Sequence, residues 1–289
     1  MKKIIFLVAL LCATTSLAGT IDPKVDDSKY LEYGAKHECV LPLIGHYSDP
    51  LNSAFKGSCV VINENYILTA AHVVYGSMTQ YVIHNNRAYP LQLVAIHVDF
   101  DPKKMKSNDI AIGRLAVPLK LDFYPEIYTE KNEKNKVCSI AGYGNTGNFD
   151  TGWRREKYDN KKRAGSNVVA NIEKNCLLTS VTDSPSTDLE FLIAPGDSGG
   201  GLFIDKKLAG IHSAVFARDG NADSDYGDYG CHTRVSDYAD WISKTQELIN
   251  TIVDFEDEEE EESDDEKKDF EEIVKKAIRL KKQKIQTEN

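Results

Sequence analysis

Residues 194–201 read Ala-Pro-Gly-Asp-Ser-Gly-Gly-Gly and are followed directly by the apolar run 202–204. Glycine permits backbone dihedrals and close approaches that a Cβ forbids, so backbone N–H groups can converge near the hydroxyl of Ser198. Convergent N–H donors stabilise an oxyanion. The stretch therefore predicts either a loop that carries a nucleophilic serine or an ordinary glycine-rich hairpin turn. Residues elsewhere in the chain are needed to distinguish the two.

A nucleophilic serine needs a base to take its proton and a carboxylate to orient that base. His72 lies directly after an apolar run, in Leu-Thr-Ala-Ala-His-Val-Val at 68–74, and Asp109 lies directly before the run Ile-Ala-Ile. Taken singly, each has a plain reading, as a structural histidine at a strand end and as a turn aspartate. Taken together, they supply the two groups that Ser198 requires.

Short runs rich in Val, Ile, Leu and Tyr alternate with Gly, Pro, Asn and Asp from residue 40 onward. Many short strands separated by turn residues predict an all-β barrel or sandwich. The predicted strands are 40–44, 58–62, 66–69, 80–83, 91–97, 110–115, 136–142, 167–172, 191–193, 201–204, 207–213 and 232–235. One helix is predicted in the body, at 236–250, where Ser236 can cap it and the apolar residues fall at helical spacing.

Residues 1–18 have the charged, apolar and small-residue order of a secretory signal peptide, with cleavage expected after Ala18. Their apolar run is shorter than the roughly 20 residues that span a bilayer, and no later run qualifies, so no transmembrane segment is predicted. The expected location is secreted or periplasmic. Residues 19–37 are polar and without period, which predicts an N-terminal leader or propeptide that is ordered only by docking on the body.

The body is expected at 38–252, and residues 253–289 are expected to form an acidic linker followed by a basic amphipathic helix. The net charge is −10, and 11 of the 13 residues 254–266 are acidic. Contiguous carboxylates repel one another and are not spaced as a cation shell, which makes calcium binding the weaker interpretation. The helix has apolar residues at helical spacing, at Phe270, Ile273, Val274, Ala277 and Leu280. A solvent-exposed segment, a protein partner and a membrane surface remain open for it. The chain lacks the basic footprint of a nucleic-acid binder.

The chain has six cysteines, and signal removal would take Cys12. The five that remain, Cys39, Cys59, Cys138, Cys176 and Cys231, allow at most two disulfide bonds, and the sequence leaves their pairing open. No Cys/His spacing typical of zinc ligands occurs. We therefore expect disulfide bonding and neither a metal nor an organic cofactor.

Three motifs resemble the chymotrypsin-like (trypsin-fold) serine peptidases: TAAH around His72, NDIA around Asp109 and GDSGG around Ser198, in this order. The resemblance covers residues from about 38 to 250. It implies two six-stranded antiparallel β-barrels with the site between them, and a serine endopeptidase that acts on polypeptides. It further implies that His72 is the base, that Asp109 orients it, that the Gly196 and Ser198 amides form the oxyanion hole, and that Ser213 supports Asp109 and lines the substrate cleft.

The specificity residues depart from the family pattern. Leu192 occupies the position at the base of the primary specificity pocket, which argues against a preference for Arg or Lys. His212 resembles the histidine that glutamyl-specific members place against an acidic side chain, so apolar and glutamyl preferences both stay open. The family's cysteine at Ala194 is absent, and its cysteine pair around the catalytic histidine would need cysteines at Gly57 and Val73.

Activation departs from the family pattern as well. In the family a newly cut N-terminal amine pairs with the aspartate before the serine, here Asp197, but no Ile-Val-Gly-Gly sequence is present. Two routes to activation stay open. Either removal of the signal peptide is sufficient and a group other than a new N-terminal amine pairs with Asp197, or a further cleavage removes part of residues 19–39. A buried Asp197 without a partner would be costly. The rival function is a catalytically weak, peptidase-like binding protein.

Overall fold

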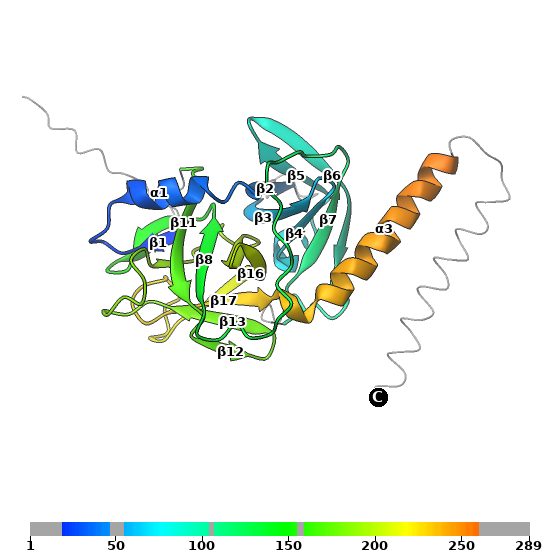
Figure 1. Cartoon of the computed structure of the whole chain (residues 1–289). Coiled ribbons are helices and arrows are strands. Elements are labelled where there is room, and N and C mark those ends of the chain that lie inside the picture. The colour runs from blue at the N-terminus through cyan, green and yellow to red at the C-terminus, as the bar shows by residue number, and fades with distance from the viewer. Residues whose placement is uncertain (1–18, 47–54, 104–106, 155–158, 260–289) are drawn as a thin grey trace, which may run out of the picture. The chain divides into compact units, whose positions relative to one another are not determined.

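The computed structural model describes residues 19–46, 55–103, 107–154 and 159–259 of the 289-residue chain (Figure 1). The expected signal peptide at 1–18 and the basic amphipathic helix at 270–280 lie outside these ranges. The chain divides into two compact units, Met1–Asp240 and Trp241–Asn289.

The first half of the body is a closed antiparallel barrel with the strand order β2-β3-β4-β7-β6-β5. The strands are β2 (Val40–His46), β3 (Phe55–Asn63), β4 (Tyr66–Thr69), β5 (Thr79–His84), β6 (Arg87–Ile96) and β7 (Ala111–Leu115). Val60 lies opposite both Val40 and Leu68, and all three are fully buried, so the predicted apolar runs form the barrel interior. Thr69 pairs with Ala111, which brings the end of β4 beside the start of β7.

The second half is a curled seven-stranded sheet with the order β11-β8-β15-β16-β17-β13-β12, on the other side of the body in Figure 1. Its strands are β8 (Val137–Gly142), β11 (Arg163–Val168), β12 (Asn171–Glu173), β13 (Cys176–Ser180), β15 (Gly201–Ile204), β16 (Lys207–Phe216) and β17 (Tyr229–Arg234). The expected trypsin-like double barrel is confirmed, with an open half-barrel in place of a second closed six-stranded barrel.

A four-stranded sheet with the order β10-β9-β1-β14 completes this half. Its strands are β1 (Gly19–Ile21), β9 (Thr146–Asn148), β10 (Gly152–Arg154) and β14 (Phe191–Leu192). β1 pairs with β14 antiparallel and with β9 parallel. The polar N-terminal segment therefore contributes a central strand to this sheet.

Helix α1 (Asp27–Ala35) follows β1 and was not predicted from the sequence. Asp26 caps it by accepting a hydrogen bond from the Ser28 N–H at 2.9 Å. Ile21 and Tyr30 belong to the same buried apolar cluster as Phe191. Two anchoring side chains in an otherwise polar segment give no periodicity, and for that reason the pattern did not reveal the helix.

Arg163 of β11 holds α1 to the body through a buried ion pair. Its side chain is fully buried and donates to both carboxylate oxygens of Asp27, at 2.6 and 2.8 Å, and to Asp159 at 3.0 Å. The bidentate geometry compensates the desolvation of the guanidinium group.

We expect Arg163→Gln to lower the free energy of unfolding by about 3–5 kcal/mol, because it leaves two largely buried carboxylates without their cation. Lys207→Gln is the control, since Lys207 makes only exposed pairs with Glu126 and Glu130 and should leave stability nearly unchanged. Urea unfolding measures both. Equal, small changes in the two variants would contradict the anchoring role of Arg163.

The body ends in a 3₁₀ turn (Val235–Asp237), and helix α3 (Ala239–Glu259) follows. The helix was predicted to end at residue 250 but continues to Glu259, so its last six residues belong to the acidic run. Glutamate has a good intrinsic helix propensity, which favours this extension. No helix among the described residues is long and apolar enough to cross a membrane.

Candidate active site

The candidate base and its carboxylate meet where β4 and β7 lie side by side. His72 lies in the short helix α2 (Ala71–Val74), directly after β4, and its Nδ1 is 2.7 Å from Asp109 Oδ2. The His72 backbone N–H also donates to Asp109 Oδ1 at 2.9 Å. A carboxylate can only accept, so Nδ1 carries the proton and Nε2 is left as the acceptor. The Asp109 side chain is 1 % exposed and that of His72 is 19 % exposed, which leaves the base reachable from solvent.

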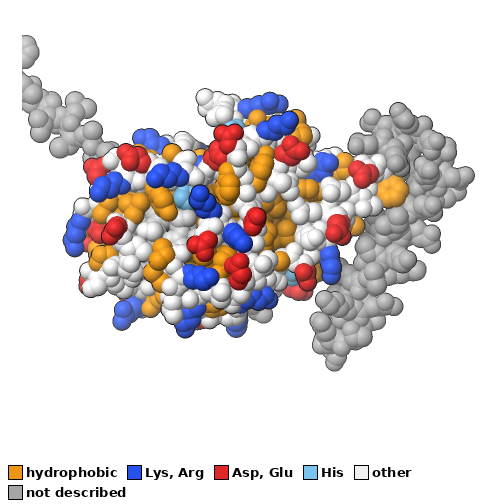
Figure 2. Space-filling model, viewed as in Figure 1, with side chains coloured by type: hydrophobic (Ala, Val, Ile, Leu, Met, Phe, Trp, Pro, Cys, Tyr) orange, Lys and Arg blue, Asp and Glu red, His pale blue; other side chains and the backbone are white. Residues whose placement is uncertain are grey.

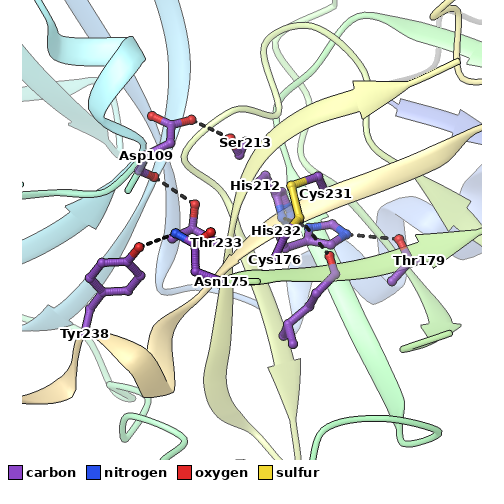
Figure 3. The surroundings of a disulfide bond; sticks show 11 residues. Asp109, Asn175, Cys176, Thr179, His212, Ser213, Cys231, His232, Thr233 and Tyr238 are labelled. Carbon is purple, nitrogen blue, oxygen red and sulfur yellow. Dashed lines mark hydrogen bonds between the residues drawn. A yellow bond between two sulfur atoms is a disulfide. The ribbon is translucent and has the colours of Figure 1, made fainter. Parts of the chain in front are cut away.

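Residues of the second half hold Asp109 in place (Figure 3). The Ser213 hydroxyl of β16 donates to Asp109 Oδ2 at 2.5 Å, and the Thr233 hydroxyl of β17 donates to the Asp109 carbonyl at 3.0 Å. Asp109 thus has its carboxylate and its backbone fixed from two neighbouring strands. Ser213, which the family resemblance expects to support Asp109, therefore lies within hydrogen-bonding distance of that carboxylate.

The segment that carries Ser198 meets the segment that carries His72 around Gly57 of β3. A Cβ on Gly57 would lie 2.8 Å from Val73 Cγ1 and 3.2 Å from the Ser198 carbonyl oxygen. The Ser58 N–H donates to that carbonyl at 2.8 Å. Gly57 and Val73 are the two positions where the family pattern would place a cysteine pair, and here the valine side chain packs directly against the glycine.

Gly199, next to the candidate nucleophile, requires glycine. Its φ is +84°, and a Cβ there would lie 2.2 Å from Thr69 Oγ1 in the strand that leads to His72. Its N–H donates to the carbonyl of His212, one residue before Ser213. In the described part of the chain, Ser198 Oγ makes no hydrogen bond. Hydrogen bonds between catalytic groups are often long in the absence of substrate.

The loop before Ser198 leaves two amides available for an oxyanion. The Asp197 N–H donates to Ala194 O at 2.9 Å and the Gly200 N–H to Asp197 O at 2.8 Å, whereas the Gly196 and Ser198 amides have no acceptor among the described residues. The Ser58 hydroxyl fixes the peptide between them by donating to Gly196 O at 3.0 Å. Ser58 has a positioning role that its place within a predicted strand did not reveal.

Asp197 is fully buried, and two backbone amides bind it. Oδ1 accepts from the Gly144 N–H at 2.7 Å and Oδ2 from the Ala194 N–H at 2.8 Å. Burial raises the pKa of this carboxyl to about 7, against the lowering effect of the two amides. These bonds connect the Gly-Tyr-Gly loop at 142–144 to the loop that carries Ser198.

His212 is fully buried, and its ring lies next to that of His232 (Figure 3). Its Nε2 is 3.1 Å from Ala141 O, so it donates there, and its Nδ1 is 2.8 Å from Nδ1 of His232. The Thr179 hydroxyl lies 3.0 Å from His232 Nε2. Burial lowers the pKa of both rings, that of His232 to about 3. Both rings are therefore neutral near pH 7, and each His212 nitrogen already has a partner.

Leu192, the other predicted specificity residue, is a fully buried residue of β14. It belongs to an apolar cluster with Phe149 and Val181, against which Tyr226 packs. A Cβ on Gly230 would lie 3.2 Å from a Leu192 methyl group, so the neighbouring strand β17 closes over this side chain. Leu192 itself is apolar and packs among apolar side chains, so it cannot pair with a basic substrate side chain.

A disulfide bond between Cys176 and Cys231 links β13 to β17 (Figure 3). Cys39, Cys59 and Cys138 are buried free thiols. Burial raises the pKa of Cys138 to about 12, which makes its thiolate inaccessible at neutral pH.

Three carboxylates gather in the loop between β16 and β17. Single oxygen atoms of Asp223, Asp225 and Asp228 lie within 4.8 Å of one another. Asp228 already accepts hydrogen bonds from the amides of Arg218 and Ser224. Asp228 therefore has a structural role in this loop. A group of acidic residues does not by itself define a metal centre.

A cavity of about 550 Å³ lies beside α1, apart from the candidate catalytic residues. Tyr33, His37, Phe123, Val137, Phe203 and Lys206 contribute to its walls. On the face shown in Figure 2, apolar side chains lie between interspersed basic and acidic ones. The walls of the cavity beside α1 include none of the predicted site residues.

Comparison with known proteins places this arrangement in a family. A family model described as Trypsin matches residues 48–242. The complement C1s subcomponent of Bos taurus is 26 % identical over 232 residues, 65 % of this chain and 32 % of the relative, and that of Rattus norvegicus is 25 % identical over 233 residues, 66 % and 32 %. The chain thus spans about a third of the length of these relatives.

Two solved structures share the fold of this chain. Neuropsin, a serine protease from mouse brain, aligns with a TM-score of 0.56 at 18 % identity and covers 74 % of this chain and 96 % of its own. A structure named GrC aligns with a TM-score of 0.57 at 17 % identity over the same shares.

Proposed function

The chain belongs to the trypsin family, and we propose that it is an active serine endopeptidase that hydrolyses polypeptides. The observation that carries the proposal is the double contact between His72 and Asp109, in which Nδ1 and the backbone N–H of one residue meet both carboxylate oxygens of the other. A histidine held in this way has a fixed tautomer and presents an unprotonated Nε2 as base.

The reaction follows from the roles of these groups. Ser198 Oγ attacks the peptide carbonyl while His72 Nε2 accepts its proton, and the amides of Gly196 and Ser198 bind the oxyanion. His72 then gives the proton to the leaving amine, and water hydrolyses the acyl-enzyme by the same steps. Asp109 stabilises the imidazolium that forms each time. Each oxyanion donor contributes about 3 kcal/mol to transition-state binding.

For specificity, we propose a preference for an apolar residue before the scissile bond. Leu192 supports it, because the residue at the expected base of the pocket is apolar and is packed among apolar side chains, so it cannot pair with a charged substrate side chain. The glutamyl alternative requires a cationic histidine, whereas His212 is buried with both nitrogens bonded.

For location, we propose export from the cytoplasm, to the periplasm or the medium. The charged, apolar and small-residue order of residues 1–18 supports it, and so does the disulfide bond between Cys176 and Cys231, which an oxidising compartment favours. N-terminal sequencing of the protein recovered from outside the cytoplasm should begin at Gly19.

A fluorophosphonate probe tests the activity. We expect it to label the purified protein at Ser198, and Ser198→Ala to abolish both labelling and peptide cleavage. Ser180→Ala, at the end of β13, is the matched control and should label as the wild type does. A folded wild-type protein that is neither labelled nor active on an apolar peptide library would instead favour the peptidase-like binding protein.

A further inference from the structure

Strand β1 lies between the two segments that lead into the active-site loops. β14, on one side of β1, ends at Leu192, two residues before Ala194. β9, on the other side, begins at Thr146, two residues after Gly144. The amides of Ala194 and Gly144 are the two donors that bind Asp197. β1 therefore joins the segments that fix the residue next to Ser198.

Buried hydroxyl groups extend this connection from β1 to the loop itself. The Thr20 hydroxyl donates to the carbonyl oxygen of Ser224 at 2.7 Å, with the Leu192 carbonyl at 3.4 Å. The Ser224 hydroxyl in turn donates to the carbonyl of Ile193 at 2.7 Å. Thr20 and Ser224 are both fully buried, so water does not compete for these bonds.

Ser224 is held firmly enough to act as an intermediate link. Its φ is +63°, and its N–H donates to Asp228 Oδ2 at 2.9 Å, while Asp228 Oδ1 accepts from the Arg218 N–H. A non-glycine residue keeps such a backbone conformation only where its surroundings fix it. The Ser224 hydroxyl therefore holds Ile193 against a rigid part of the β16–β17 loop.

We propose that Thr20 and Ser224 are positioning residues for the segment 193–198, and that strand β1 is a permanent part of the active enzyme. The inference rests on the proposed peptidase function. At Ala194 the family pattern has a cysteine, and in this chain two hydroxyl groups secure the same segment. Oxyanion donors contribute to catalysis only when they are already in place, so a small shift of this segment lowers the rate of acylation.

Thr20→Val removes the hydroxyl at nearly constant volume, and Thr20→Ser keeps it. In the full-length mature protein, we expect Thr20→Val to lower kcat and the rate constant of fluorophosphonate labelling at least tenfold, and Thr20→Ser to stay within twofold of the wild type. Ser236→Ala is the matched control, because it removes a buried hydroxyl that bonds to Glu133, outside this connection. It should lower the melting temperature and leave kcat unchanged.

A purely structural role for Thr20 would give Thr20→Val a lower melting temperature with the wild-type kcat, and that result would overturn the proposal. If Thr20→Val does not fold, Ser224→Ala breaks the next bond in the same connection and is judged by the same two rates. Labelled enzyme whose intact mass lacks residues 19–35 would also overturn it.

Hydrogen exchange of the backbone amides in residues 193–198 tests the positioning role of Thr20 independently of whether the protein is an active peptidase. Faster exchange in Thr20→Val than in Ser236→Ala supports the positioning role, even if the wild type proves unreactive toward the probe. Unchanged exchange in Thr20→Val contradicts it, whether or not the protein is an enzyme.

Discussion

Asp109→Asn should lower kcat by about 10⁴-fold, the loss known for this substitution in a triad of the same kind. The carboxylate accepts from both Nδ1 and the backbone N–H of His72, and from the Ser213 hydroxyl. An amide has a single acceptor oxygen, and its NH₂ group would meet one of these donors. The imidazole then adopts the tautomer with the proton on Nε2, where it cannot accept the proton of Ser198.

Burst-phase kinetics with an activated ester measure the acylation step of this variant. Ser213→Ala is the graded comparison, because it removes one of the three hydrogen bonds to the carboxylate and leaves the tautomer of His72 intact. We expect it to lose far less activity than Asp109→Asn. Equal losses in the two variants would show that Asp109 acts through its support by β16 rather than by orienting His72.

The candidate catalytic groups and the barrel strands could be located in the sequence because their signals are local. Each of TAAH, NDIA and GDSGG sits at a strand end, and the apolar runs around them have the length of buried strands. The sequence did not contain the register Thr69 opposite Ala111, which sets His72 beside Asp109. That register follows from closure of the barrel, a long-range condition.

The N-terminal segment was not predictable for the opposite reason. Its contacts are polar and specific: Asp27 with Arg163, far along the chain, and Thr20 with Ser224. Neither pair leaves a periodic pattern in the sequence. β13 was missed because Cys-Leu-Leu-Thr-Ser does not alternate, being buried on both faces at its first four residues. The sequence placed His212 next to Ser213, but it did not show that the His212 side chain is buried. That orientation depends on the contact between its ring and the ring of His232.

Asp197→Asn is expected to lower kcat by about 10²- to 10³-fold, the scale of one lost oxyanion donor. The wild-type carboxylate accepts from Gly144 on one oxygen and from Ala194 on the other. In the amide, an N–H group would face one of these two N–H donors, so one side of the loop must move away. The Gly196 amide lies in that loop, directly beside residue 197.

Glu133→Gln is the matched control, because Glu133 is a fully buried carboxylate that binds Arg234 and Ser236 away from Ser198. It should destabilise the fold and keep the wild-type kcat. Stopped-flow labelling of Ser198 compares the variants. A kcat for Asp197→Asn within threefold of the wild type would show that the loop does not depend on this carboxylate.

The raised pKa of Asp197 also leads to a prediction of how the stability of the fold varies with pH. Burial raises the pKa of Asp197 from 3.8 to about 7 in the folded protein, so between these values the folded state keeps a proton that the unfolded state has released. The contribution of Asp197 to stability is therefore complete below about pH 4 and is lost as the pH rises through about 7. Relative to Asp197→Asn, the free energy of unfolding of the wild type should fall by up to a few kcal/mol over this range, since one pKa unit corresponds to about 1.4 kcal/mol.

Urea unfolding of the wild type and Asp197→Asn at pH 4.5, 5.5, 6.5 and 7.5 measures this difference, because the contributions of the other carboxylates cancel. A difference that increases with pH would mean that the ionised carboxylate is stabilised in the folded protein, and hence that a cation reaches it. The free amine of a mature N-terminus at Gly19, at the head of β1, is the group to test in that case. Blocking that amine by acetylation would then restore the decrease.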